Sequence, residues 1–354
     1  MAILPRSFPN PRDFAALMPN LRHAPARFDV VGIGNAIVDV LVRAEESFLA
    51  DHGLTKGAMT LIDAAQAERL YAAMGPAREC SGGSAANTIA GLASIGASCA
   101  FVGKVRDDQL GQVFAHDIRA LGVGFDTAPA PRGAPTARCL IFVTPDAQRT
   151  MQTYLGASVG LGPEDIEPRR IAEAKVVYLE GYLWDPPAAK EAFRKAARAA
   201  ADAGRLVALS LSDPFCVERH RAEFRDLVEG HVDLLFANEE EIKSLYQVST
   251  FDAALQKVRG HCQVAALTRS AKGAVIVAGD EIHVIDAEPI GRVVDTTGAG
   301  DAFAAGFLYG LTHDFDLARS GLAGAIAAAE AIGHFGARPE TPLKRLVADR
   351  LGNI

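Results

Sequence analysis

The chain has 354 residues, of which 49% are hydrophobic and 22% charged, and its formal net charge at pH 7 is -7. This is the composition of a globular protein, and the length allows one large domain with an appendage or two domains. The negative charge and the lack of a basic run argue against a general nucleic-acid-binding protein, because excess cations are needed to displace counterions from phosphates. Five scattered cysteines without a CxxC pair predict reduced thiols in a cytoplasmic protein rather than disulfides or a zinc site.

Residues 1–27 contain five prolines and lack a continuous apolar stretch. They therefore resemble neither a signal peptide nor a membrane span, and we expect a poorly ordered N-terminal extension. The most apolar later segment, residues 321–333, is interrupted by Glu330 and is too short to cross a bilayer. We expect it to form a buried, alanine-rich helix.

The run from Phe28 to Asn35 predicts a buried strand followed by a turn. Its Gly32-x-Gly34 pair is typical of dinucleotide-binding sites, but Ile37 stands where such a site has a third glycine. A Rossmann-type dehydrogenase therefore rests on this pair alone. Short apolar segments at about 37–62 and 136–155 predict strands of a small sheet that could act as a lid over a site that excludes water.

From Ile171 onward, short apolar runs alternate with helical patterns. This alternation predicts a mainly parallel sheet covered by helices on both faces, in which ligands bind beyond the carboxyl ends of the strands. Polar residues follow several of the predicted strands. They are Glu180 to Tyr182, Ser210 to Asp213, Asn238 to Glu241, and Thr268 to Ser270.

Two glycine-rich segments each precede a predicted helix. Gly82-Gly83 comes before a helix that carries Asn87, and Gly298-Ala299-Gly300 comes before a helix that begins near Asp301. Amides at a helix N-terminus favour a phosphate, and a carboxylate beside them can accept a proton. The second segment therefore suggests phosphoryl transfer to a hydroxyl. The simpler alternative is that the glycines only form tight turns and that Asp301 is an ordinary first-turn acid.

Two further segments could meet a nucleotide. Asn238 and Glu241 are three residues apart, so they project from one side of a first helical turn toward phosphates or magnesium. The segment from Thr268 to Gly273 offers hydroxyls, amides and a cation. The alternatives are favourable negative charge at a helix N-terminus for the acidic cluster and a solvated turn for the other segment. The sequence contains no GxxxxGK[ST] phosphate loop.

This ordered set of motifs resembles the ribokinase and adenosine kinase superfamily, also called the PfkB carbohydrate kinases, from Phe28 to about Pro342. The resemblance is carried by Gly34-Asn35 with Asp39, Gly82-Gly83 with Asn87, Asn238-x-x-Glu241, and Asp295 through Asp301. It implies an α/β fold: a ribokinase-like αβα three-layer domain over residues 28–354, with a mainly parallel central sheet and a small β-sheet lid. It also implies ATP and Mg²⁺ as cofactors.

The resemblance also implies a role for individual residues. Asp301 would be the catalytic base, with an anion hole made by Gly298, Ala299 and Gly300. The acceptor would be held by Asn35, Asp39, Gly83 and Asn87, and ATP by Asn238, Thr268, Ser270 and Gly273. Glu241 would bind Mg²⁺, partly through water, and Asp295 and Thr297 match a K⁺ site completed by the backbone of Ala331 and Gly336.

The acceptor is the least defined element. Ser84 after Gly82-Gly83 is more similar to adenosine kinases than to many sugar kinases, so we expect a nucleoside, adenosine first, with Ile37, Phe125, Met151 and Tyr154 as candidate walls of a base pocket. A free sugar such as ribose or fructose is the alternative acceptor. A non-catalytic nucleoside- or sugar-binding protein is the alternative of another class. The resemblance is compatible with a monomer or with a homodimer through the lid.

Overall fold

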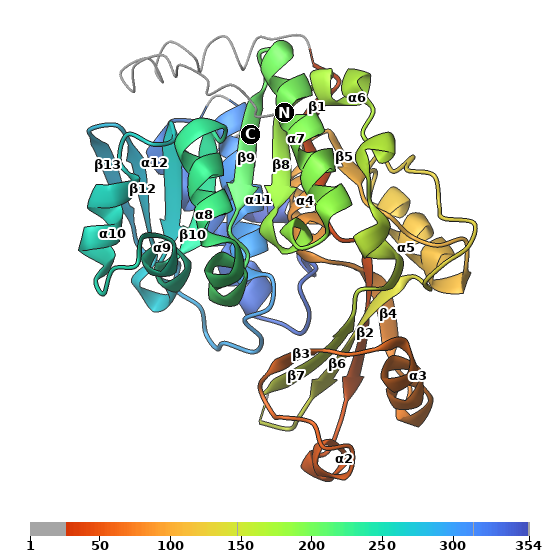
Figure 1. The fold of residues 1–354 in the computed structure, drawn as a ribbon. Coiled ribbons are helices and arrows are strands. Elements are labelled where there is room, and N and C mark those ends of the chain that lie inside the picture. The colour runs from red at the N-terminus through yellow and green to blue at the C-terminus, as the bar shows by residue number, and fades with distance from the viewer. Residues whose placement is uncertain (1–25, 147, 314, 353–354) are drawn as a thin grey trace.

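The computed structural model describes residues 26–146, 148–313 and 315–352. Its main domain is built on an eight-stranded sheet with the order β13-β12-β11-β10-β9-β8-β1-β5, and the strands from β5 to β11 are parallel (Figure 1). Only β12 and β13, at one edge, run antiparallel to their neighbours. The strands are β1 (Phe28–Ile33), β5 (Cys99–Val102), β8 (Ala174–Glu180), β9 (Leu206–Ser210), β10 (Leu234–Asn238), β11 (Val264–Thr268), β12 (Ala274–Ala278) and β13 (Glu281–Ile285).

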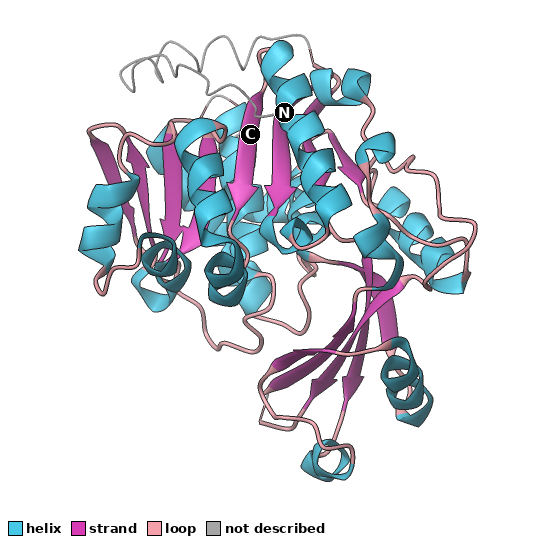
Figure 2. Ribbon diagram, in the orientation of Figure 1, coloured by secondary structure: helices cyan, strands magenta, loops and turns pink. Residues whose placement is uncertain are grey.

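Helices cover both faces of this sheet (Figure 2). Side chains alternate along each strand between the two faces. In β1, Val30 belongs to one apolar cluster, whereas Val31 and Ile33 belong to the other. The first cluster includes α4 (Ser84–Ile95), α5 (Gln109–Ala120), α11 (Ala299–Thr312), α12 (Leu317–Ile332) and α13 (Leu343–Leu351). The second includes α6 (Pro168–Ala172), α7 (Pro187–Asp202), α8 (Pro214–Gly230), α9 (Glu239–Tyr246) and α10 (Phe251–Val258). The result is a three-layer αβα domain.

A second sheet of five strands lies beyond one end of the main sheet, toward which the arrows of β8 and β9 point (Figures 1 and 2). Its order is β3-β7-β6-β2-β4, with β3 at one edge. The strands are β2 (Ile37–Arg43), β3 (Met59–Leu61), β4 (Arg78–Gly82), β6 (Ala137–Val143) and β7 (Arg149–Tyr154), and the helices α2 (Glu46–Asp51) and α3 (Ala64–Ala73) accompany them. We call this sheet and its helices the lid.

The two faces of the lid differ in what covers them. Val38, Val40 and Val42 of β2 join a cluster with Leu49 of α2 and Leu70 of α3. The alternate residues of β2 and β6 form a separate apolar cluster, against which Phe335 packs. This second face, which we call the inner face, consists of Ile37, Leu41, Ala137, Cys139 and Ile141, with Cys80, Val143, Met151, Leu155 and Phe335 packed against it.

The sequence analysis predicted the ribokinase-like αβα architecture, and the structure confirms it. Two strands were not anticipated: β4, which completes the lid, and the edge strand β13. Residues 1–25 of the expected extension lie outside the described residues, while Arg27 donates its backbone N–H to Glu173. The five cysteines are free, and no described helix is long and apolar enough to cross a membrane.

Candidate active site

The N-terminus of α11 carries the predicted base. Gly298 is the N-cap residue with a left-handed φ of 71°, and a Cβ there would lie 2.6 Å from the Cβ of Ala337, so both conformation and space favour glycine. The backbone N–H groups of Gly300 and Asp301 donate no hydrogen bond to any of the described residues. A Cβ placed at Gly300 would meet nothing within 4 Å in the described chain. This helix end is therefore open to an anion.

Asp301 lies where α11 packs closely against α4. A Cβ at Gly91 would lie 2.8 Å from the Cβ of Ala305, so glycine allows this approach. As a result, Ser84 Oγ donates to one oxygen of Asp301 at 2.6 Å, and Asn87 Nδ2 donates to the other at 3.4 Å. Burial raises the pKa of Asp301 to about 6, opposed by these two hydrogen bonds and by the charge of Arg338. The carboxylate is thus ionised at neutral pH and close to its own pKa, as a general base should be.

The N-terminus of α4, in contrast, is occupied by a carboxylate of the protein itself. Glu180 is the last residue of β8 and accepts a hydrogen bond from the backbone N–H of Ala85 at 2.8 Å. Asn35 donates its Nδ2 to the same carboxylate at 2.7 Å and accepts one from Ser158 Oγ at 2.8 Å. Asn35 is only 1% exposed, and both ends of its amide have protein partners. Direct contact with a sugar is therefore not what its geometry favours.

Asp39 projects from the inner face of the lid, on the same side of β2 as Ile37 and Leu41. Gly82 allows its approach, because a Cβ at that position would lie 2.3 Å from the Asp39 carboxyl carbon. Burial raises the pKa of Asp39 to about 7, with Arg338 opposing the rise and Asp301 adding to it. Asp39 and Asp301 are therefore close enough to interact electrostatically, and Gly83, the N-cap residue of α4, follows Gly82 directly in the chain.

A second contact joins the lid to the glycine-rich loop. Arg149, the first residue of β7, places its Nε 2.5 Å from a carboxylate oxygen of Asp295 and its Nη2 3.3 Å from Thr296 Oγ. Asp295 is 3% exposed, and it also accepts hydrogen bonds from Thr297 at 2.7 Å and from the N–H of Gly336 at 3.0 Å. The guanidinium of Arg149 thus neutralises the carboxylate that the family resemblance associates with K⁺.

On the predicted nucleotide side, Asn238 and Glu241 contact each other. They form a reciprocal capping box at the start of α9: Asn238 Nδ2 donates to Glu241 at 2.6 Å, and Glu241 N donates to Asn238 Oδ1 at 2.9 Å. Burial raises the pKa of Glu241 to about 7, opposed by a hydrogen bond from Asn238 N–H, and the charges of Asp213 and Asp301 add to it. Glu241 is therefore a partly protonated carboxyl that a divalent cation would bind in its ionised form.

The segment from Thr268 to Gly273 forms the tight turn between β11 and β12. Arg269 donates its N–H to the carbonyl of Gly273 at 2.7 Å, and Ser270 has a positive φ of 52°. Ser270 is exposed, and Thr268 and Gly273 are half-buried. Arg269 also contacts Glu239 at 3.2 Å, so this turn lies beside the start of α9. The structure therefore brings the predicted ATP-binding residues of β10, α9 and β11 together.

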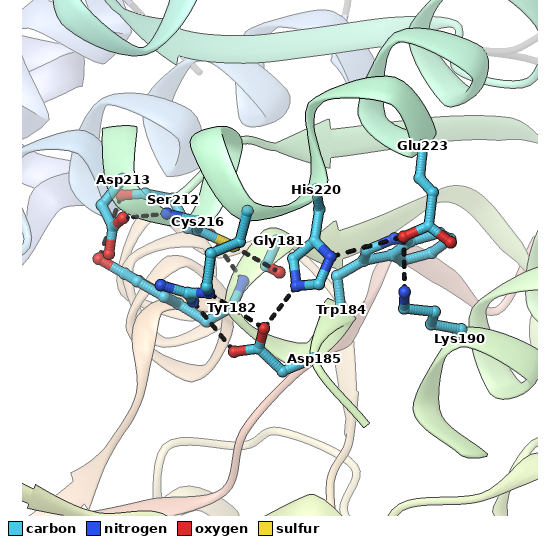
Figure 3. A network of polar contacts seen from close by, with 11 residues as sticks. Gly181, Tyr182, Trp184, Asp185, Lys190, Ser212, Asp213, Cys216, His220 and Glu223 are labelled. Carbon is cyan, nitrogen blue, oxygen red and sulfur yellow. Dashed lines mark hydrogen bonds and ion pairs between the residues drawn. The ribbon is translucent and has the colours of Figure 1, made fainter. Parts of the chain in front are cut away.

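Figure 3 shows a polar network that fixes the loops after β8 and β9. The Tyr182 hydroxyl donates to the carbonyl of Ser212 at 3.2 Å, and Tyr182 N donates to Ser212 Oγ at 3.1 Å. Farther along, His220 lies 2.5 Å from Asp185. Asp213 caps α8 by accepting from Cys216 N at 2.6 Å, and it is near enough to Glu241 to raise its pKa. The network thus positions one more carboxylate at the strand ends.

One expectation about the base pocket needs correction, and two residues need to be added to the site. Phe125 is not a wall of a base pocket: it is 2% exposed and packs in the main core, with its ring centroid 5.2 Å from that of Phe114. Sequence reasoning missed Arg338 and Arg149, which are single arginines outside every motif. Pairing each with a partner required knowledge of the fold, because their contacts join segments far apart in the chain.

An ionisable aspartate at an open helix N-terminus, beneath a lid and facing polar strand ends, is the arrangement of an enzyme that transfers a phosphoryl group to a hydroxyl. The model of the pfkB family carbohydrate kinases matches residues 62–344, and the chain belongs to this family. It is a phosphotransferase with an alcohol group as acceptor. Kinases of this family use ATP, typically together with Mg²⁺.

The similar proteins include both nucleoside and sugar kinases. The crystal structure of adenosine kinase from Sinorhizobium meliloti superposes with a TM-score of 0.86 and 52% identity, covering 93% of this chain and 100% of that one. A probable sugar kinase from Rhizobium etli gives a TM-score of 0.87 and 53% identity over 92% and 99%. An ATP-dependent ribose-1-phosphate kinase from Halopiger xanaduensis is 32% identical over 69% of this chain and 77% of its own.

Proposed function

We propose that this enzyme transfers the γ-phosphoryl group of ATP to the primary hydroxyl of a nucleoside, with adenosine as the first candidate and AMP as its product. The observation that carries the proposal is a buried amide oxygen, without a hydrogen-bond donor, next to the proposed catalytic base Asp301. Asn87 is 7% exposed, and its Oδ1 has no hydrogen-bond partner within the part of the chain that the structure describes. A sugar hydroxyl placed there would donate a hydrogen bond to this Oδ1 and lie next to Asp301.

The inner face of the lid supports a base attached to that sugar. Ile37, Leu41 and Ile141 surround Asp39 with apolar side chains, and Met151 and Phe335 pack against the same cluster. An aromatic base needs such an apolar surface, whereas a free sugar presents hydroxyls on every side and would leave this surface without a complementary partner. Of the four walls considered from the sequence, Ile37 and Met151 belong to this cluster.

The charges favour a neutral acceptor over one that already carries a phosphate. Asp39 and Asp301 face the acceptor region, and Glu180 lies near it. The guanidinium of Arg338 is bound to backbone carbonyls, and that of Arg149 to Asp295. The Halopiger relative is a ribose-1-phosphate kinase, so the acceptor of that protein already carries a phosphate. In this chain, such a phosphate would approach carboxylates and be repelled by them. A nucleoside does not incur this repulsion.

In the proposed reaction, Asp301 accepts the proton of the acceptor hydroxyl while the hydroxyl oxygen attacks the γ-phosphorus, and the bond from that phosphorus to the bridging oxygen breaks to release ADP. Asp39, Gly83 and Asn87 orient the sugar, and Asn35 acts indirectly by holding Glu180 against α4. The amides of Gly298, Ala299 and Gly300 bind the charge that gathers on the migrating group. The lid excludes water, so transfer to the hydroxyl competes better with hydrolysis.

The donor would lie over the ends of β10 and β11, with Asn238, Thr268, Ser270 and Gly273 along it. Glu241 fits a Mg²⁺ ligand, partly through water, because it is a buried carboxyl that no cationic side chain of the described residues balances by a hydrogen bond or ion pair. Mg²⁺ would neutralise phosphate charge in the transition state. Asp213 adds negative charge at the same place, which supports cation binding there.

A K⁺ site at Asp295 and Thr297 is a separate proposal, and one contact weighs against it. Arg149 already lies 2.5 Å from the Asp295 carboxylate. We therefore expect ATP-dependent turnover in a sodium-free buffer to change little, less than about twofold, when K⁺ replaces tetramethylammonium. A large stimulation by K⁺ would instead support the cation site.

The deciding experiment for the acceptor is a panel of adenosine, other nucleosides, ribose, fructose and ribose-1-phosphate with ATP and Mg²⁺, read by ADP formation. We expect adenosine to give the highest kcat/KM. The Asp301→Asn variant, purified in the same way, controls for contaminating kinases. A higher kcat/KM for a free sugar would replace the nucleoside by the alternative acceptor.

The rival of another class is a protein that binds a nucleoside or a sugar without catalysis. The site supports catalysis instead, because Asp301 is hydrogen-bonded by Ser84 and the amides of Gly300 and Asp301 have no acceptor among the described residues. Isothermal titration of adenosine and of ATP, combined with the ADP-formation assay, decides between them. Binding of both ligands without ADP formation would favour the rival.

Compartment and assembly are also proposals. The five free thiols support a reducing, cytoplasmic environment. For assembly, β3 is an edge strand of the lid whose Met59 and Leu61 are 43% and 55% exposed. A second copy could pair there, whereas a monomer would leave the edge in water. Sedimentation velocity of the wild type and of a Leu61→Lys variant separates the two.

A further inference from the structure

Arg338 lies in the loop between α12 and α13, and its guanidinium reaches the first turn of α4. Its Nε donates to the carbonyl of Ser81 at 2.8 Å, its Nη1 to the carbonyl of Ala86 at 2.8 Å, and its Nη2 to Ser81 Oγ at 2.8 Å and also to the Ser81 carbonyl. Ser81 and Ala86, which accept these hydrogen bonds, lie on either side of the Gly82-Gly83 pair beside the proposed sugar site. One side chain therefore fixes both ends of the segment that surrounds the sugar site.

The charge of Arg338 has no carboxylate among those hydrogen-bond partners. Its acceptors are two backbone carbonyls and a hydroxyl, although carboxylates on three other elements lie close enough to interact electrostatically. The ionisable groups that face it are Asp39 on β2, Cys80 on β4, Asp117 on α5 and Asp301 on α11. A half-buried cation that is hydrogen-bonded to neutral groups exerts its field on these carboxylates without blocking their oxygens.

The two carboxylates of the acceptor site need such a field. Burial raises the pKa of Asp39 to about 7 and that of Asp301 to about 6, and Arg338 opposes both rises. The two carboxylates also repel each other, since Asp301 raises the pKa of Asp39. Beyond Arg338, the ionisable groups that interact with Asp301 are Asp39, Tyr178, Glu180, Tyr182 and Glu241, and none of these carries positive charge.

We propose that Arg338 is a positioning residue for phosphoryl transfer: one guanidinium holds the backbone from Ser81 to Ala86 in place and supplies the positive charge against which Asp39 and Asp301 stay ionised. The oxygens of both carboxylates remain free for the acceptor because the arginine binds the chain beside them. This inference rests on the proposed roles of Asp39 and Asp301 and adds a residue that no motif contains.

The test separates charge from hydrogen bonding with two variants. Arg338→Gln keeps a donor but removes the charge, whereas Arg338→Lys keeps the charge but loses the planar clamp. We measure kcat and kcat/KM for adenosine from pH 5 to 9, with thermal unfolding as the record of folding. In Arg338→Gln, the acid limb should move to higher pH, so that activity at pH 6 relative to pH 8.5 falls roughly three- to tenfold below the wild-type ratio. In Arg338→Lys, the limb should stay at the wild-type pH even if kcat falls.

A purely structural role predicts a different result: both variants would lower activity by the same factor at every pH, and that outcome would overturn the proposal. If Arg338→Gln does not fold, the double variant Arg338→Gln/Asp117→Asn also removes a carboxylate that the guanidinium faces, and a smaller shift in the same direction is expected of it. The proposed role of Asp301 as the base is tested separately: near-normal turnover of Asp301→Asn would refute it. An unmoved limb in a protein that Asp301→Asn inactivates would refute only the role of Arg338.

Discussion

The glycine-rich N-termini of α4 and α11 are built from similar residues and end in opposite states. At α4, Glu180 accepts the amide of Ala85 at 2.8 Å, so a carboxylate of the protein occupies the position where an anion would bind. At α11, the amides of Gly300 and Asp301 have no acceptor within the described ranges. A glycine-rich turn before a helix therefore does not by itself make a phosphate site. What lies opposite the amides decides whether they hold the fold together or meet a ligand.

The largest effect should come from the side chain that distinguishes the two helix N-termini chemically. Asp301→Asn keeps the shape of the α11 terminus but cannot accept a proton, so we expect kcat to fall about 10²- to 10⁴-fold. Adenosine binding, followed by isothermal titration, should change little. Asp316→Asn at the start of α12 is a matched control, since Asp316 caps its helix by accepting from Arg319 N at 2.7 Å outside the site. Near-wild-type kcat in Asp301→Asn would remove Asp301 from the mechanism.

The next effect tests whether the α11 amides are a binding surface. A methyl group at Gly300 meets nothing within 4 Å in the described chain, and alanine favours a helix by up to about 1 kcal/mol, so Gly300→Ala should fold at least as stably as the wild type. If the migrating phosphoryl group lies against this backbone, activity should nevertheless fall roughly 10- to 100-fold.

Gly298→Ala is the matched comparison on the same loop. Its left-handed φ of 71° and the contact with Ala337 should lower the free energy of unfolding by about 1 to 3 kcal/mol. Urea denaturation and kcat/KM of both variants give the comparison. Full activity in a stable Gly300→Ala protein would mean that the α11 terminus does not hold the transferred group.

At the N-terminus of α4, pH should act on stability. Burial raises the pKa of Glu180 from 4.5 to about 7, opposed by its hydrogen bonds from Ala85 and Asn35. Because the folded-state pKa is the higher one, the stabilising contribution of this group is complete below about pH 4.5 and is lost as pH rises through 7. In Glu180→Gln, the decrease in unfolding free energy between pH 5 and pH 8 should be smaller than in the wild type, by about 2 kcal/mol. Equal decreases in both proteins would contradict a titrating Glu180.

The smallest effect concerns the contact between the two helices. The hydrogen bond that Ser84 Oγ donates to Asp301 at 2.6 Å lowers the pKa of that carboxyl, and Ser84→Ala removes this hydrogen bond. The acid limb of kcat/KM should therefore move upward from about pH 6, while kcat at pH 8.5 falls less than about threefold. Ser94→Ala, which removes a hydrogen bond to Leu343 N at the far end of α4, is the control. An unchanged limb would show that Ser84 does not tune the base.

What the sequence predicted well is local. The run from Asp295 to Phe307 predicted a glycine-rich turn and a buried helix, and the apolar run from Ile37 to Val42 predicted a strand of the lid. The acidic segment at Asn238 was also placed correctly at a strand end, although its two polar residues turned out to cap their own helix.

What the sequence did not predict depends on packing between distant segments. Arg338 meets Ser81 across 257 residues, and Arg149 meets Thr296 across 147. No spacing rule connects such positions. Phe125 was misplaced for the same reason, because an aromatic residue near a lid has the same sequence pattern whether it faces a ligand or, as here, the main core.

The pairing of β2 with β6 has a consequence for how the chain folds. It joins Ile37 to Ala137 in parallel. This pair of lid strands can therefore close only after the roughly one hundred residues between them have been brought into place, and these include α4, β5 and α5 of the main domain as well as α2, β3, α3 and β4 of the lid. We expect the lid to form late in folding, so that a chain released during synthesis before β6 would have neither a lid nor an enclosed acceptor site.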